Sequence, residues 1–166
     1  MATKTSFTPE EWQLLMEGIM SSGVAVTAAD PSGLWGLLKE GMASASTLVA
    51  AKSNPQSNEL IKAIIADIET KDARSRIQDG LRKKFAGAKP GEVKTRSIDA
   101  LQQASRLLDA KAPDEAAAIK GLMQTIGQSV AQAASEGGVL GIGGVKVSEP
   151  EKATLSEISK ALNLPA

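Results

Sequence analysis

Cationic side chains gather in residues 71–96, and they are the clearest candidates for binding chemistry in this sequence. The segment holds nine Lys and Arg residues against three carboxylates. Because the 166-residue chain is neutral as a whole, the rest of it carries an excess of six negative charges. Such asymmetry is typical of a surface that binds an anion or a partner. The candidate binding residues are Arg74, Arg76, Arg82, Lys83, Lys84, Lys89, Lys94 and Arg96.

Three interpretations of this basic segment stay open. Nucleic-acid phosphates are one candidate partner, because lysine and arginine bind the backbone without reading its sequence. Base stacking on single strands is disfavoured, since Phe85 is the single aromatic residue of the segment. A partner protein or a second copy of the chain is another candidate. The third interpretation is a solvated helical hairpin whose charges pair with the acidic remainder.

Catalytic side chains are scarce in this composition. The sequence contains no histidine, cysteine or tyrosine, which removes the usual general base, the thiolate nucleophile and the phenolic acid. A metal site would need oxygen ligands, but Asp67, Glu69 and Asp72 lack the glycine and the final glutamate of a calcium loop. We therefore expect a solvated helix face there, no cofactor and no enzymatic activity. An enzyme with an acidic site is the lowest-ranked alternative.

Residues 136–148 form a glycine-rich stretch that does not fit a nucleotide-binding loop. A dinucleotide fingerprint needs a third glycine where Lys146 stands, and a Walker loop needs Lys and Ser or Thr directly after the last glycine. The interspersed apolar residues predict a structural loop packed onto a core. Leu140→Ala is then expected to destabilise the fold by about 2–4 kcal/mol. The loop glycines are Gly137, Gly138, Gly141, Gly143 and Gly144.

Local signals divide the chain into helices. Thr8 followed by Glu11 predicts a capping box, and Ser148 followed by Glu151 predicts another. Pro90 and the boundary at residues 112–114 predict further helix starts. Apolar residues recur at helical spacing between these signals, and no window alternates convincingly as a strand does.

These signals together predict one all-α domain over residues 1–166. The domain is expected to be a bundle of six to eight helices with short loops, and its first residues, 1–7, are expected to be flexible. Ser21, Ser22 and Gly23 are expected to break or bend the first helix. No membrane span is expected, because the longest uncharged run, residues 121–135, falls short of the ~20 apolar residues that a span needs.

Two stretches of the sequence match each other at a fixed offset. Residues 28–37 read AADPSGLWGL and residues 133–142 read AASEGGVLGI, so the alanine pair and two glycines coincide. An internal duplication would make both stretches turns between helices that are related by a pseudo-twofold axis. Chance similarity between alanine-rich helices that end at glycine is the alternative.

The C-terminal part of the sequence resembles a known family. Residues 136–162, EGGVLGIGGVKVSEPEKATLSEISKAL, are similar to the tail of small bacterial all-helical proteins and, distantly, to the tellurite-resistance TerB-like family. Residues 144–149 match that family's turn and helix cap, and residues 29–33 match them more loosely. The family has an aspartate where this chain has Gly143, so Asp30 is the single carboxylate that matches.

The resemblance implies a stress-associated helical module and not an enzyme. Together with the composition, it favours a non-enzymatic, cytoplasmic bacterial protein that acts through protein–protein association or as a homodimer. Nucleic-acid or anionic-ligand binding through residues 71–96 is the alternative.

Overall fold

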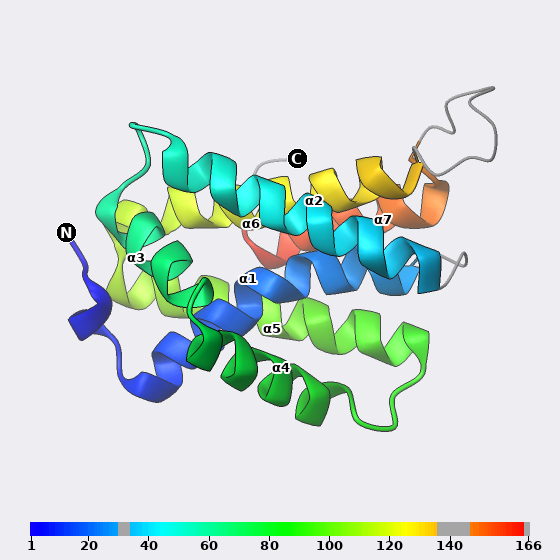
Figure 1. Ribbon diagram of the computed structural model, residues 1–166, viewed down its shortest axis with the longest axis horizontal. Coiled ribbons are helices and arrows are strands. Elements are labelled where there is room, and N and C mark those ends of the chain that lie inside the picture. The colour runs from blue at the N-terminus through cyan, green and yellow to red at the C-terminus, as the bar shows by residue number, and fades with distance from the viewer. Residues whose placement is uncertain (30–33, 136–146, 165–166) are drawn as a thin grey trace.

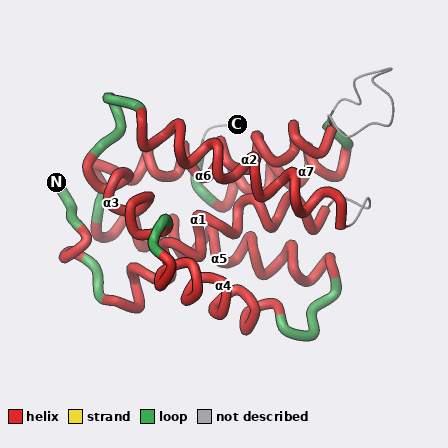
Figure 2. The backbone as a smooth tube through the Cα atoms, viewed as in Figure 1, coloured by secondary structure: helices red, strands yellow, loops and turns green. Residues whose placement is uncertain are grey.

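The computed structural model describes the backbone of residues 1–29, 34–135 and 147–164, and the side chains of these residues apart from 34–43 and 134–135. Within these ranges the chain forms helices and no strand (Figure 2), which confirms the predicted all-α bundle. The elements are a 3-10 turn η1 (Lys4–Ser6) and the helices α1 (Pro9–Ala29), α2 (Leu34–Ser53), α3 (Glu59–Ile68), α4 (Lys71–Phe85), α5 (Pro90–Lys111), α6 (Pro113–Ser135) and α7 (Glu149–Ala161).

Helix starts follow the predicted capping chemistry. The Thr8 N–H donates to Glu11 at 2.8 Å, and the Glu11 N–H donates back to the Thr8 hydroxyl at 3.2 Å. Ser148 and Glu151 form the same reciprocal pair at the start of α7. Each pair satisfies backbone donors that have no partner inside the helix. Both predicted capping boxes are therefore confirmed.

Helix α1 lies at the centre of the bundle. It contacts α5 and α6 most extensively and also touches α2, α4 and α7. Figure 1 shows α2 and α6 on one side of α1 and α4 and α5 on the other. Leu15, Ile19 and Val26 of α1 are fully buried, so the apolar spacing of this helix supplies the middle of the core.

Helix α1 continues through Ser21, Ser22 and Gly23, so the break that the sequence predicted as one of two outcomes is wrong, while the bend stays a prediction. The Ser22 hydroxyl donates to the Met123 carbonyl oxygen of α6 at 2.6 Å. A Cβ atom on Gly23 would lie 2.9 Å from the Ser44 hydroxyl of α2. These small residues allow neighbouring helices to approach closely, and that packing overrides their low helix propensity.

Residues 1–7, for which the sequence suggested flexibility, lie against the bundle. Phe7 is 7% exposed, and its ring centroid lies 5.6 Å from that of Trp12. The Ala2 N–H donates to the buried Glu115 carboxylate at 3.1 Å. Burial of the Phe7 ring is the physical reason for this placement, since it removes a large apolar surface from water.

Gly121 in α6 is expected to tolerate a side chain. A Cβ atom there would meet nothing within 4 Å, so Gly121→Ala should raise the free energy of unfolding by about 0.5–1 kcal/mol through helix propensity. Urea unfolding followed by circular dichroism measures the change.

Gly127 on the same helix is the matched control. Its Cβ atom would lie 3.0 Å from the Ser22 hydroxyl and 3.2 Å from Ile158 Cδ1, so Gly127→Ala should not show the gain. Equal effects of the two substitutions would contradict this account of the two glycines.

Candidate functional site

A groove of about 910 Å³ separates the beginning of α1 from α4. Arg76 and Lys83 of α4 stand on one of its rims, while Phe7, Trp12 and Met16 contribute to its floor. Arg76 and Lys83 lie seven residues apart, which is two helical turns, so they share one face of α4. The groove therefore combines a cationic rim with an apolar floor, and we name it the α1–α4 groove.

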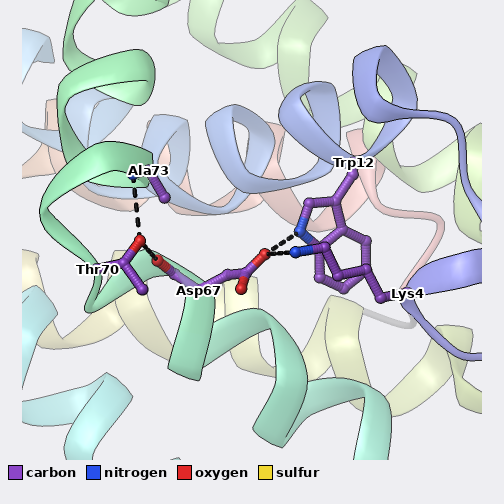
Figure 3. Close-up of polar contacts among 5 residues, drawn as sticks. All are labelled: Lys4, Trp12, Asp67, Thr70 and Ala73. Carbon is purple, nitrogen blue, oxygen red and sulfur yellow. Dashed lines mark hydrogen bonds and ion pairs between the residues drawn. The ribbon is translucent and has the colours of Figure 1, made fainter.

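Trp12 is fixed by a polar contact beneath this groove. Its indole N–H donates to a carboxylate oxygen of Asp67, at the end of α3, at 2.7 Å. Lys4 of η1 forms an ion pair with the same oxygen and lies 5.7 Å from the centroid of the Trp12 ring. Figure 3 shows Lys4 and Trp12 converging on this carboxylate. The contact joins η1 and α1, which are neighbours in the sequence, to α3, where Asp67 lies 55 residues after Trp12.

The surroundings of Asp67 favour its charged form. Burial acts to raise the pKa of this carboxyl group, but hydrogen bonds from Lys4 and Trp12, together with the positive charges of Lys4 and Arg76, lower it more strongly. The net result is a pKa below the ordinary value of 3.8. A carboxylate at this end of α3 is thus stabilised by two donors and a nearby guanidinium group.

The lowered pKa of Asp67 predicts a pH-dependent stability. A depressed carboxyl pKa contributes stability above the unfolded-state pKa, and this contribution is lost as the pH falls through the folded-state pKa. We therefore expect wild type to lose more stability than Asp67→Asn as the pH is lowered from 6 to below about 4. Urea midpoints across this range measure the difference. Parallel losses in the two proteins would contradict the assignment.

Glu17 brings α1 and α4 together on the other side of the groove. Its side chain is 12% exposed, and its carboxylate lies 3.1 Å from the Lys84 ammonium and 2.9 Å from the Gln13 amide nitrogen. A Cβ atom on Gly80 would overlap Glu17 Oε1, so the Glu17 carboxylate takes this position only because residue 80 has no side chain. The ion pair holds α4 against α1, although α4 buries little apolar surface of its own: of its residues only Ala73 and Ile77 are buried.

Four of the eight predicted binding residues are held by contacts within the chain. Their carboxylate or carbonyl partners leave them less available for a ligand. The contacts are Lys84 to Glu17 at 3.1 Å, Arg82 to Asp79 at 3.5 Å, Lys94 to Glu157 at 2.9 Å and Arg96 Nη1 to the Lys84 carbonyl oxygen at 2.7 Å.

The other four predicted residues are exposed, and none has an ion pair or side-chain hydrogen bond within the described part of the chain. They are Arg74, Arg76, Lys83 and Lys89. Only Arg76 and Lys83 line the groove. The structure therefore brings two of the eight residues together at one site and does not gather the whole set.

Several other sequence predictions concern residues without a described placement. The loop glycines 137, 138, 141, 143 and 144, Leu140 and Asp30 lie outside the described residues, and so do both turns of the proposed duplication. The packed-loop prediction, the duplication and the resemblance at the glycine turn thus stay predictions.

The carboxylates at residues 67–72 turn toward different partners. Asp67 accepts from Trp12, whereas Glu69 pairs with Lys52. Across the described side chains, no group of three or more acidic residues is placed to hold a metal ion. Sequence reasoning missed the contact between Trp12 and Asp67, because 55 residues separate them and no local pattern links the two.

Comparisons of the chain with protein-family models, curated proteins and solved structures gave no match. Within the described ranges, no helix has both the length and the apolar character needed to cross a membrane.

Proposed function

We propose that the protein is a non-enzymatic association module that binds a partner through the α1–α4 groove. The observation that carries the proposal is the pair Arg76 and Lys83, which are exposed on the groove rim and form no ion pair with a described residue, although the charge of Arg76 acts on Asp67. Protein interfaces typically combine an apolar centre with a polar rim, and arginine and aromatic residues are enriched in them. The groove has these components in a small area.

Three of the described carboxylates near the groove have structural roles, which support a binding function over a catalytic one, whereas Glu10 is exposed in the first turn of α1. Glu17 forms an ion pair with Lys84 of α4, Asp67 accepts the Trp12 N–H, and Glu11 caps α1. Acid–base catalysis needs a carboxylate that can reach a substrate proton. These three groups are occupied by neighbours instead.

Photo-crosslinking in the native cell tests the proposed surface. A benzophenone amino acid at position 5, in place of the exposed Thr5 of η1 that lines the groove, should give a discrete protein adduct, whereas the same residue at exposed position 152 of α7 should not. Adding Arg76→Glu with Lys83→Glu should abolish the adduct from position 5. No adduct from position 5, or the same adduct from both positions, would refute the proposal.

The proposal includes self-association as one form of partner binding. An adduct of twice the chain mass would identify a second copy, and sedimentation over a range of protein concentrations would measure its affinity. A cytoplasmic bacterial setting and a stress-associated role are part of the same proposal. They rest on the absence of cysteine and on the resemblance at residues 136–162.

Nucleic-acid binding through residues 71–96 remains the alternative proposal, because Arg74, Arg76, Lys83 and Lys89 are exposed without ion pairs. Phosphate-driven binding to duplex DNA weakens with a log–log salt slope of about −0.9 for each phosphate contacted. We expect no retention on duplex DNA at low salt, because half of the predicted cations have partners within the chain. Retention with a slope of about −4 or steeper would favour the alternative.

A further inference from the structure

The proposed function does not say what kind of partner binds, but the charges that line the groove limit which partners fit. Resting on that function, we infer that the occupant is a short segment of a partner protein that places a carboxylate against Arg76 and Lys83 and an apolar side chain against Trp12. The three residues lie on two elements, α4 and α1, and all line the same groove.

The charges that line the groove divide unequally between its two rims. On the α4 side, Asp79 forms an ion pair with Arg82 at 3.5 Å, whereas Arg76 and Lys83 form no ion pair with a described residue. Two further charged residues that line the groove have partners outside it: Glu17 pairs with Lys84, and Lys4 pairs with Asp67. On the α1 side, Glu10 is exposed in the first helical turn. Two cations therefore face one carboxylate across the groove after the internal pairs are taken into account.

Asp67 shows how a carboxylate is accommodated next to this groove. It receives the Trp12 N–H and the Lys4 ammonium, and the charge of Arg76 helps to lower its pKa. Arg76 thus already acts on an anion within the chain. A partner carboxylate on the rim would meet the exposed side of the same guanidinium group, with Lys83 two turns away on α4.

The size and floor of the groove favour a short segment over a folded domain. A volume of about 910 Å³ lies at the upper end of the ~300–1,000 Å³ typical of ligand sites. Phe7, Trp12 and Met16 are 7%, 4% and 1% exposed, so the apolar floor offers little additional area. Binding must therefore depend strongly on charge, and we expect it to weaken as salt is raised.

Labelled peptides test this inference on the full chain. A peptide of alternating Glu and Leu should bind in a fluorescence anisotropy assay at low salt, and peptides with Gln or Lys in place of Glu should bind at least tenfold more weakly. The double substitution Arg76→Gln, Lys83→Gln should weaken binding of the Glu–Leu peptide at least tenfold. Glu10→Gln should strengthen binding of the Glu–Leu peptide about twofold, because it removes a negative charge that repels the peptide's carboxylates.

The matched control removes two positive charges elsewhere. Lys62→Gln with Lys152→Gln changes a half-buried side chain on α3 and an exposed one on α7, and we expect less than a twofold effect. Thermal unfolding of each variant establishes that it is folded. A Glu–Ser peptide that bound as well as the Glu–Leu peptide would overturn the apolar part of the inference.

The two proposals can fail separately. Crosslinks from position 5 to a partner would leave the association function standing even if acidic peptides did not bind, or bound equally well to the Arg76→Gln, Lys83→Gln variant. That pair of results would overturn the inferred chemistry. Groove-dependent peptide binding without any cellular adduct would support the chemistry and count against the proposed function. Equal losses in the groove and control variants would refute the groove as the binding site.

Discussion

Gly18→Leu is expected to lower the free energy of unfolding by about 4 kcal/mol or more. A Cβ atom on Gly18 would lie 2.5 Å from the Cβ atom of Ala104 and 3.4 Å from the Ala100 carbonyl oxygen. Neither atom can move aside by a rotamer change, so α1 and α5 would have to separate. Leu101 and Leu108 of α5 are fully buried beside this crossing, and separation would expose them or leave voids.

A smaller substitution and its rescue isolate the contact. Gly18→Ala should still destabilise by about 1–3 kcal/mol, although alanine raises helix propensity by about 1 kcal/mol. Ala104→Gly should recover part of this loss when it is combined with Gly18→Ala, because it removes the opposing Cβ atom. Urea unfolding of both single variants and the double variant gives the coupling energy. Additive effects would show that the two residues do not oppose each other.

The same crossing shows what sequence patterns can and cannot predict. Helix starts were predictable because capping depends on residues three apart, as in Thr8 with Glu11 and Ser148 with Glu151. Gly18 and Gly23 carry no local sign that a neighbouring helix covers them. Ser22 likewise predicted a break or a bend, because the local sequence does not reveal its hydrogen bond to Met123, which lies 101 residues away. Low helix propensity is a local property, whereas close helix packing is a tertiary one.

The candidate site was predictable to a similar degree. The excess of positive charge at residues 71–96 was visible in the sequence, and it includes Arg76 and Lys83. The sequence could not tell these two from Lys84 or Lys94, which pair with Glu17 and Glu157 across 67 and 63 positions. The groove itself arises from the approach of η1 and α1 to α4, which depends on tertiary contacts at Gly80 and Asp67.

Trp12→Ala is expected to be the second severe substitution, with a loss of about 3–5 kcal/mol. The Trp12 side chain is 4% exposed and packs against Phe7, so its removal leaves a cavity under η1. It also removes the N–H that donates to Asp67. Chemical unfolding measures the total loss, and near-ultraviolet circular dichroism reports whether the surrounding core remains packed.

Trp12→Phe separates the hydrogen bond from the burial of the ring. Phenylalanine keeps an aromatic ring but has no donor, and a hydrogen bond to a charged group contributes about 1.5–3 kcal/mol. We expect a loss in that range at pH 7, smaller than that of Trp12→Ala. The loss should shrink as the pH falls below about 4 and Asp67 becomes protonated. A loss of unfolding free energy that is constant with pH would mean that the aromatic ring alone stabilises the contact between α1 and α3. A pH-dependent loss would instead assign part of the stability of the groove floor to its bond with α3, so that the floor and the carboxylate near Arg76 are one structural unit.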